Sequence, residues 1–344
     1  MMNRATTRSS GWRTVTVAVF SVLAFCTLQA SVWAQSATGV ISSGHVELAK
    51  QDAPRDSLWL LSTRHLTSQA WRANLETPSF RMARIDACGG CVPTTLATFL
   101  EEERPGTVDV IYVHGNRMPA EGVIERGLFV YRNIVRHRPA GSPPVRFLIW
   151  SWPSERQGLA LRDVRIKAAR TDAQALYLAW LLREQTHRGR VQRVVGFSFG
   201  GRVATGALHA LAGGTLGGRQ LPGVHLEGAE IGVGLLAPAI GEDWLMPGRD
   251  HGRATLNISH ITLLFNQRDA ILRRYPLLDP ASGVEALGYR GPRNFGPGFD
   301  GRPVNIFQMN CSDTVGLRHR EDAYYTGRCQ AGARIYMMSI RNAF

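Results

Sequence analysis

The chain has 344 residues, of which 44% are hydrophobic and 19% are charged, a composition typical of a globular protein and not of a disordered one. Its length allows one large core or two modest ones. The formal net charge of +13 comes almost entirely from arginines that are dispersed along the chain and not grouped with aromatic residues. The charge therefore does not predict a nucleic-acid partner; compositional bias, or adhesion to an acidic envelope surface, would account for it.

The N-terminus has the pattern of a secretory signal peptide. Three arginines precede an apolar stretch at residues 15–28, and small residues follow where a signal peptidase cleaves. We predict cleavage near Ala34, so residues 1–34 form a signal peptide and the mature chain is periplasmic or secreted, with a charge of +13 less three, or +10. The alternatives are a membrane anchor, for which the apolar run is short, and lipid attachment at Cys26, which bulky Phe25 disfavours. We expect no membrane span in the mature chain.

The remaining chain divides into a lead-in at residues 35–106 and a core at residues 107–344. The lead-in is polar at first, then has two expected strands at 57–67 and 79–86 and a connector at 87–106. In the core, apolar runs predict strands at 108–113, 145–150, 191–195, 230–236, 260–265 and 304–309, and helical periodicity predicts helices at 122–136 and 165–187 and one ending near 211.

This alternation predicts an α/β protein with a mostly parallel, doubly wound sheet and helices on both faces. The strands of the core are continuous apolar runs, as a sheet covered on both faces requires. Two segments rich in glycine and proline, 237–256 and 276–303, are either surface loops or a small lid over the site.

The pentapeptide Gly196-Phe197-Ser198-Phe199-Gly200 lies between an expected strand and an expected helix. In that context a G-x-S-x-G sequence is typical of a nucleophile elbow. The glycines permit a strained turn that lifts the serine hydroxyl above the sheet edge, and the helix N-terminus beneath it favours negative charge. The alternative, in a chain with 36 glycines, is a glycine-rich turn with an exposed serine.

A nucleophilic serine needs a histidine to take its proton and a carboxylate to hold that histidine, here in the chain order Ser, acid, His. Asp269 leaves the end of an expected strand and is the predicted acid. His319, in the loop after the last expected strand, is the one histidine of ten that follows both Ser198 and Asp269, and it is the predicted base. The competing acids are Asp243, Asp279 and Asp313.

Two backbone amides are expected to form an oxyanion hole. One is that of Phe199, directly after the serine, and the other is that of Asn116, in the loop after the strand at 108–113. Gly115 lets this loop approach closely. His114 could be a metal ligand, but without a second ligand nearby we expect a structural hydrogen-bonding role. Neither a metal nor a cofactor is predicted.

Four cysteines remain after cleavage, and an even number in an exported chain favours disulfides. The spacing suggests Cys88–Cys91 and Cys311–Cys329, although the sequence does not fix the connectivity. A bridge between Cys311 and Cys329 would enclose His319 in a closed loop. The alternatives are a redox-active C-x-x-C at residues 88–91 and a zinc site made by all four cysteines.

Several motifs resemble those of the α/β-hydrolase superfamily over about residues 105–325. They are Tyr112-Val113-His114-Gly115-Asn116, Ile149-Trp150-Ser151-Trp152-Pro153-Ser154 and the serine pentapeptide, followed by Asp269 and His319. The Trp-Ser-Trp-Pro-Ser stretch, with a long helix before the elbow, is similar to the uncharacterised bacterial DUF900 family. The superfamily resemblance implies hydrolysis of an ester, thioester or amide through an acyl-enzyme intermediate, without a cofactor.

Together these features predict an exported serine hydrolase, namely a carboxylesterase acting on a small-molecule or acyl substrate. The alternatives are an acyltransferase or peptidase using the same triad, a catalytically silent scaffold with a binding role, and a thiol-disulfide oxidoreductase. The aromatic residues Phe197, Phe199, Trp150 and Trp152 could line an acyl pocket, but we expect core packing. The sequence decides neither the natural substrate nor the oligomeric state.

Overall fold

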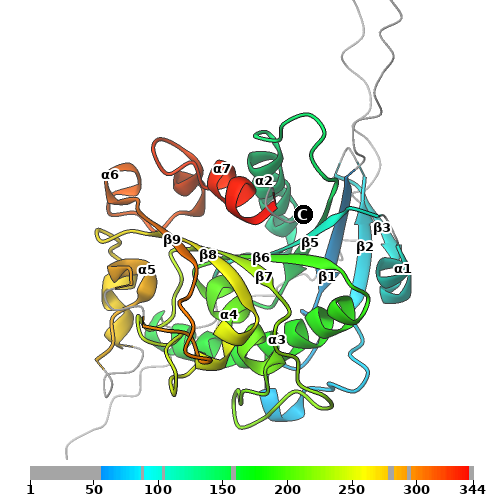
Figure 1. Ribbon diagram of the computed structural model, residues 1–344, viewed down its shortest axis with the longest axis horizontal. Helices are drawn as coiled ribbons and strands as arrows, with labels where there is room; N and C mark the ends of the chain where they lie inside the picture. Colours follow the sequence, from blue (N-terminus) through cyan, green and yellow to red (C-terminus); the bar gives the residue numbers. More distant parts are fainter. Residues whose placement is uncertain are drawn as a thin grey trace, which may run out of the picture. The chain divides into compact units, whose positions relative to one another are not determined.

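The computed structural model describes residues 56–86, 89–102, 105–155, 160–277, 283–292 and 296–340, with the side chains of 160–165 and 338–339 excepted (Figure 1). The predicted signal peptide lies outside the described residues, as do most of the polar lead-in and Cys88. Among the described helices, none has both the length and the apolar character that crossing a bilayer requires.

A nine-stranded sheet, in the order β3-β2-β1-β5-β4-β6-β7-β8-β9, forms the centre of the described chain. Strand β2 runs antiparallel to β1 and β3, and the other neighbouring strands are parallel. The strands are β1 (Ser57–Ser62), β2 (Arg81–Ile85), β3 (Cys91–Thr94), β4 (Val108–Val113), β5 (Val145–Ser151), β6 (Val191–Phe197), β7 (Ile231–Leu236), β8 (Ile258–Phe265) and β9 (Ile306–Asn310).

Helices cover both faces of this sheet (Figure 1), which confirms the predicted doubly wound α/β class. Helices α2 and α7 pack together on one face, and α3 and α4 pack together on the other. The α-helices are α1 (Leu96–Glu101), α2 (Val123–Val135), α3 (Ala160–His187), α4 (Phe199–Leu211), α5 (Leu287–Arg290), α6 (Ser312–Val315) and α7 (Ala331–Ile335).

Short helical turns complete the described elements. The 3₁₀ turns are η1 (Ala70–Arg72), η2 (Ala120–Gly122), η3 (Gly252–Leu256), η4 (Leu272–Leu277) and η5 (Glu321–Tyr325), and a π-helical turn, η6 (Tyr336–Ile340), follows α7. Two of them, η4 and η5, begin within three residues of the predicted acid and base, so they bear directly on the site.

The connector predicted at residues 87–106 contains an edge strand and a helix, and that prediction was incomplete. Strand β3 adds to the sheet through β2, and α1 begins where the Thr95 hydroxyl accepts a hydrogen bond from the Thr98 amide at 3.0 Å. Strand β1 pairs in parallel with β5, so the strands of the lead-in belong to the same sheet as those of the core.

The central strands carry one polar pair that is fully enclosed. Asp109 on β4 accepts hydrogen bonds from the Arg146 guanidinium on β5, with Nε–Oδ1 at 2.7 Å and Nη2–Oδ2 at 2.5 Å, and from Gln185 Nε2 at 2.7 Å. Arg146 also donates to the Phe99 carbonyl at 2.6 Å and lies over its ring. These partners satisfy both charges, as burial demands, and tie α1 and α3 to the middle of the sheet.

The strand order places a topological switch beside β4. The chain leaves β4 for β5 on one side and returns to β6 on the other side, so the connections after β4 and β6 diverge. In open α/β sheets, ligand sites form at such a point, outside the carboxyl ends of the strands. The loop at residues 114–117 and the serine pentapeptide both begin there.

Candidate active site

Ser198 occupies a strained turn between β6 and α4. Its backbone has φ 53° and ψ −117°, a conformation that side chains other than glycine rarely adopt. The Ser198 amide donates to the Leu236 carbonyl at 2.9 Å, and the Ser198 carbonyl accepts from the Gly201 and Ala239 amides at 3.0 and 3.1 Å. Hydrogen bonds to the end of the neighbouring strand β7 and to the residues after it therefore hold the turn in place. They keep the Ser198 backbone in its strained conformation.

The glycines of the pentapeptide are required by close backbone contact. A Cβ at Gly200 would lie 1.9 Å from the Val113 carbonyl oxygen, and a Cβ at Gly196 would lie 2.5 Å from the Gly200 carbonyl carbon. Both contacts are with backbone, which cannot move aside as a side chain can. The G-x-S-x-G spacing thus permits α4 to begin directly against the end of β4.

The structure brings the three sequence-predicted residues Ser198, His319 and Asp269 into one hydrogen-bonded chain. His319 Nε2 lies 2.9 Å from Ser198 Oγ, and His319 Nδ1 lies 2.6 Å from Asp269 Oδ2. Because the Asp269 carboxylate can only accept, Nδ1 carries the proton and Nε2 is left to accept from the serine hydroxyl. This arrangement can take a proton from Ser198 and stabilise the imidazolium that forms.

Asp269 is held in a single orientation. Its side chain is fully buried, and Oδ1 accepts hydrogen bonds from the Ile271 and Leu272 amides, both at 2.9 Å. The carboxylate therefore caps the start of η4 while Oδ2 faces His319. Of the competing acids, Asp243 pairs with Arg249 at 3.2 Å and Asp279 lies outside the described residues.

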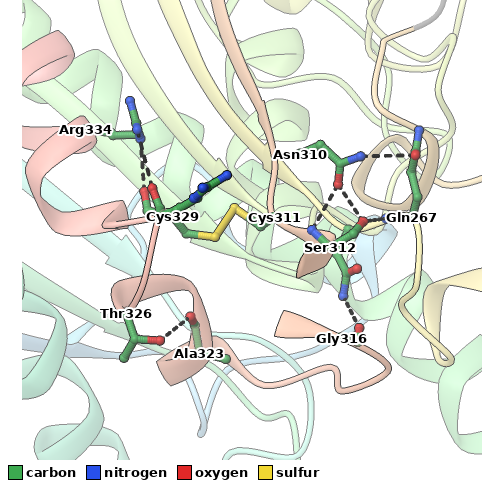
Figure 2. Close-up of a disulfide and its surroundings, with 11 residues drawn as sticks. Gln267, Asn310, Cys311, Ser312, Gly316, Ala323, Thr326, Cys329 and Arg334 are labelled. Atoms are coloured by element: carbon green, nitrogen blue, oxygen red, sulfur yellow. Dashed lines mark hydrogen bonds between the residues drawn. A yellow bond between two sulfur atoms is a disulfide. The ribbon is translucent and has the colours of Figure 1, made fainter. Parts of the chain in front are cut away.

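Two contacts fix the His319 ring and its loop. The Phe197 ring stacks on the imidazole with centroids 5.0 Å apart, so the second residue of the pentapeptide positions the His319 ring. The predicted Cys311–Cys329 disulfide is present, and it closes the loop that carries His319 (Figure 2).

Side chains at the start of this loop join it to the loop after β8. Ser312 Oγ accepts from the Gln267 amide at 2.8 Å, and Asn310 Nδ2 donates to Gln267 Oε1 at 3.1 Å (Figure 2). Asn266 Nδ2 donates to the Gly316 carbonyl at 2.7 Å. Because Asn266 and Gln267 directly precede the loop segment with Asp269, these bonds align Asp269 with His319.

A buried pair that the sequence did not indicate links the histidine loop to β4. The Tyr112 hydroxyl donates to Glu321 Oε2 at 2.7 Å, and both side chains are buried. Burial raises the pKa of Glu321 to about 7, although the Tyr112 hydrogen bond and the charge of Arg126, 4.0 Å away, favour the ionised form. The two partners are 209 positions apart, so only the fold reveals the pair.

His114 has the structural role expected of it. Its ring stacks on Trp152, Nδ1 donates to the Gly115 carbonyl at 2.9 Å, and Nε2 accepts from the Trp152 amide at 3.3 Å. Burial lowers the pKa of His114 to about 3, so the ring is neutral and both nitrogens are satisfied. This ring anchors the loop after β4 to the end of β5.

The predicted oxyanion donors flank the elbow. A Cβ at Gly115 would lie 2.8 Å from the Phe197 ring and 3.2 Å from its carbonyl oxygen, so this loop lies directly on the elbow. Within the described part of the chain, neither the Asn116 amide nor the Phe199 amide has a hydrogen-bond acceptor. Phe199 is the first residue of α4, where an amide has no partner within its helix.

The remaining candidates lie away from this centre. Trp150 and Trp152 are fully buried in the core, in agreement with the expected packing role. Cys91 is exposed at the start of β3 and forms no disulfide with a described residue, and its pairing with Cys88 stays a prediction. The described residues contain no group of three or more side chains suited to a metal ion.

No family model and no curated protein matches the chain. The solved structures similar to it include two of esterase B from Lactobacillus rhamnosis, one with a C4-C4 SN3 tributyrin phosphonate and one that is C6-C4 SN3 inhibited. Each is 14% identical, has a TM-score of 0.37 and covers 84% of this chain, with 86% and 88% of its own chain covered. That TM-score is too low to support an argument. The α/β fold is therefore assigned from the chain's own strand order and contacts.

Proposed function

We propose that this chain is an exported serine hydrolase of the α/β-hydrolase superfamily and acts as a carboxylesterase. The observation that carries the proposal is the hydrogen-bonded chain from Ser198 through His319 to buried Asp269, at 2.9 and 2.6 Å. The strained turn at Ser198 and the switch point beside β4 support it. The Cys311–Cys329 disulfide supports export, because such bonds persist in oxidising compartments.

In the proposed reaction Ser198 Oγ attacks an acyl carbonyl while His319 Nε2 takes the hydroxyl proton. His319 returns that proton to the leaving alcohol, which departs and leaves an acyl-enzyme on Ser198. Water then attacks the acyl group with His319 again as base, releasing the acid and restoring the serine. Asp269 keeps the ring in the required tautomer throughout and stabilises its positive charge.

The Asn116 and Phe199 amides are the proposed donors to the tetrahedral oxyanion. Both belong to segments that meet at the elbow, and the α4 N-terminus adds a favourable dipole. Removal of one such donor costs on the order of 10²–10³ in kcat in serine hydrolases. This chemistry requires no metal and no cofactor.

The experiment is a panel of chromogenic esters with graded acyl chains, given to the wild type, to Ser198→Ala and to Ser142→Ala. Ser142 lies in the loop before β5, away from the triad, and serves as the matched control. We expect turnover by the wild type and the control, and a loss of about 10⁴-fold or more in Ser198→Ala. Ester turnover that survives in Ser198→Ala, or that is absent from the wild type, would overturn the proposal.

Added alcohol acceptors and amide substrates separate the alternatives that use the same triad. A carboxylesterase releases free acid at a rate that the acceptor changes little, an acyltransferase forms the new ester, and a peptidase cleaves the amide. Complete inactivity toward all three, with folded protein, is the outcome expected of a silent scaffold.

A further inference from the structure

Two loops that carry the acid and the base form one exposed face beside the triad. They lie side by side, because the Ala270 amide donates to the Leu317 carbonyl at 3.2 Å and His319 meets Asp269 between them. The side chain of His319 is 14% exposed, so the triad reaches solvent where these loops meet. We name this face the rim and define it by Arg268, Ile271, Arg273, Arg274, Leu317 and Arg318.

The rim displays two aliphatic side chains that the fold does not use. Ile271 is 55% exposed and Leu317 is 66% exposed, whereas their near neighbours Leu272 and Val315 are each 4% exposed. Each of these loops thus buries one aliphatic side chain in the core and presents another to solvent, next to the catalytic hydrogen bonds. An isolated exposed aliphatic residue is ordinary, but two exposed aliphatic side chains on touching loops beside the triad are available to an apolar partner.

The same face carries unneutralised positive charge. The four rim arginines, Arg268, Arg273, Arg274 and Arg318, are exposed and form no ion pair with the described residues. Most acidic side chains in these loops do not offset this charge at the surface. Asp269 and Glu321 are buried, and Asp322 pairs with Arg320. Asp313 is the exposed acid that remains among the described residues of the two loops.

We propose that the rim docks on an anionic phospholipid surface and so presents an ester held in that surface to Ser198. Aliphatic side chains partition into the boundary between headgroups and acyl chains, and arginines bind phosphate with paired hydrogen bonds. The combination complements anionic lipid, because exposed arginines and exposed aliphatic side chains occur on the same two touching loops, and a charged polymer would engage only the arginines. The presentation of an ester rests on the proposed function, whereas docking itself does not.

Sedimentation with lipid vesicles tests docking without any turnover. The Ser198→Ala protein is mixed with vesicles of phosphatidylcholine alone or with phosphatidylglycerol added. We expect binding to the anionic vesicles that weakens with salt, and at least tenfold less binding to phosphatidylcholine. In the same background, Ile271→Ser with Leu317→Ser lowers the binding constant about tenfold or more, and Arg268→Gln and Arg318→Gln lower it about fivefold each.

Matched controls come from exposed positions away from the rim. Val224, 75% exposed, lies in the loop that enters the amino end of β7, and Val224→Ser should leave binding unchanged. Arg72→Gln with Arg81→Gln removes two exposed arginines near the far edge of the sheet and should cost less than twofold. Thermal unfolding of every variant establishes that it is folded.

The proposal is overturned if the Ser198→Ala protein binds neither kind of vesicle, or if it binds both kinds equally. It is also overturned if the control substitutions weaken binding as much as the rim substitutions do. Its failure is distinguishable from failure of the proposed function. Ester turnover without vesicle binding contradicts the rim alone, and vesicle binding by a protein that hydrolyses no ester contradicts the hydrolase alone.

Discussion

At the scale of single residues, the proposed mechanism depends on the tautomer of His319, which leaves Nε2 free to accept the Ser198 proton. Asp269 accepts two backbone hydrogen bonds through Oδ1 and one from His319 through Oδ2, so its orientation is fixed before any substrate binds. The same backbone bonds would hold an asparagine at this position with its amide nitrogen toward the ring.

We therefore expect Asp269→Asn to lower kcat/KM by about 10³–10⁴-fold without unfolding the protein. The asparagine amide would donate to Nδ1, which moves the ring proton to Nε2 and removes the acceptor for the serine proton. Steady-state kinetics with a chromogenic ester, together with a thermal unfolding curve, provide the measurement. A loss smaller than tenfold in folded protein would show that Asp269 does not set the tautomer.

At the scale of elements, the histidine loop is fastened at both ends. Strand β9 and α7 are joined through Cys311–Cys329, and η5 is joined to β4 through Glu321 and Tyr112. The loop between these attachments carries His319, so the position of its imidazole depends on both.

Removing the disulfide should loosen this loop. With a separation of 18 residues, the bridge contributes about 3 kcal/mol in the chain-entropy model, so Cys311→Ser with Cys329→Ser should lower the free energy of unfolding by about that amount. It should also lower kcat more than it raises KM, because the base is less often in place. Urea unfolding and ester kinetics measure the two effects; unchanged values of both would mean that the bridge does not support the site.

The buried Glu321 gives a pH-dependent prediction. Its pKa is raised from 4.5 to about 7 by burial, so folding favours its protonated form, and its contribution to stability is lost as pH rises from 4.5 through 7. Tyr112, Tyr325, Arg126 and Asp322 are the groups that act on it. Glu321→Gln keeps an acceptor for Tyr112 and cannot ionise.

The difference in melting temperature between Glu321→Gln and the wild type should therefore be near zero at pH 4, small at pH 5 and clearly in favour of the variant at pH 8. Tyr112→Phe is the companion variant, because it removes the donor and should destabilise the protein by about 1–3 kcal/mol at neutral pH. A difference for Glu321→Gln that does not change with pH would contradict the assigned pKa.

At the scale of the whole molecule, buried neutral histidines set the response to acid. Burial is the largest cause that lowers the pKa of His114 to about 3, those of His209 and His260 to about 4, and that of His251 well below 6.5. In the unfolded chain each would titrate near 6.5. Stability is therefore complete above that value and is lost as pH falls through it toward the folded pKa values.

We expect unfolding near pH 5.5 to take up roughly three protons, about four by the histidines less about one that Glu321 releases. The slope of unfolding free energy against pH then approaches about 4 kcal/mol per unit there. Urea unfolding at pH 7.5, 6.5 and 5.5 measures it. Stability that is constant or rises over this range would contradict the neutral, buried state of these rings.

Much of this molecule was predictable from sequence because its signals are local. The strands predicted at 108–113 and 191–195 are rich in valine and other apolar residues, and the order Ser198, Asp269, His319 follows from each residue coming after the end of a strand. The short elements β3 and α1 were missed because four to six residues carry too little periodicity. Pairs such as Tyr112–Glu321, and the exposure of Leu317, depend on contacts between distant segments and appear only in the fold.

The most direct test of the central claim is the site of reaction with a serine-reactive phosphonate, mapped by peptide mass spectrometry. The account predicts a single adduct on Ser198 in the folded protein, with labelling slowed at least a hundredfold in His319→Ala. No adduct on intact protein, or an adduct on another serine that persists in Ser198→Ala, would contradict it.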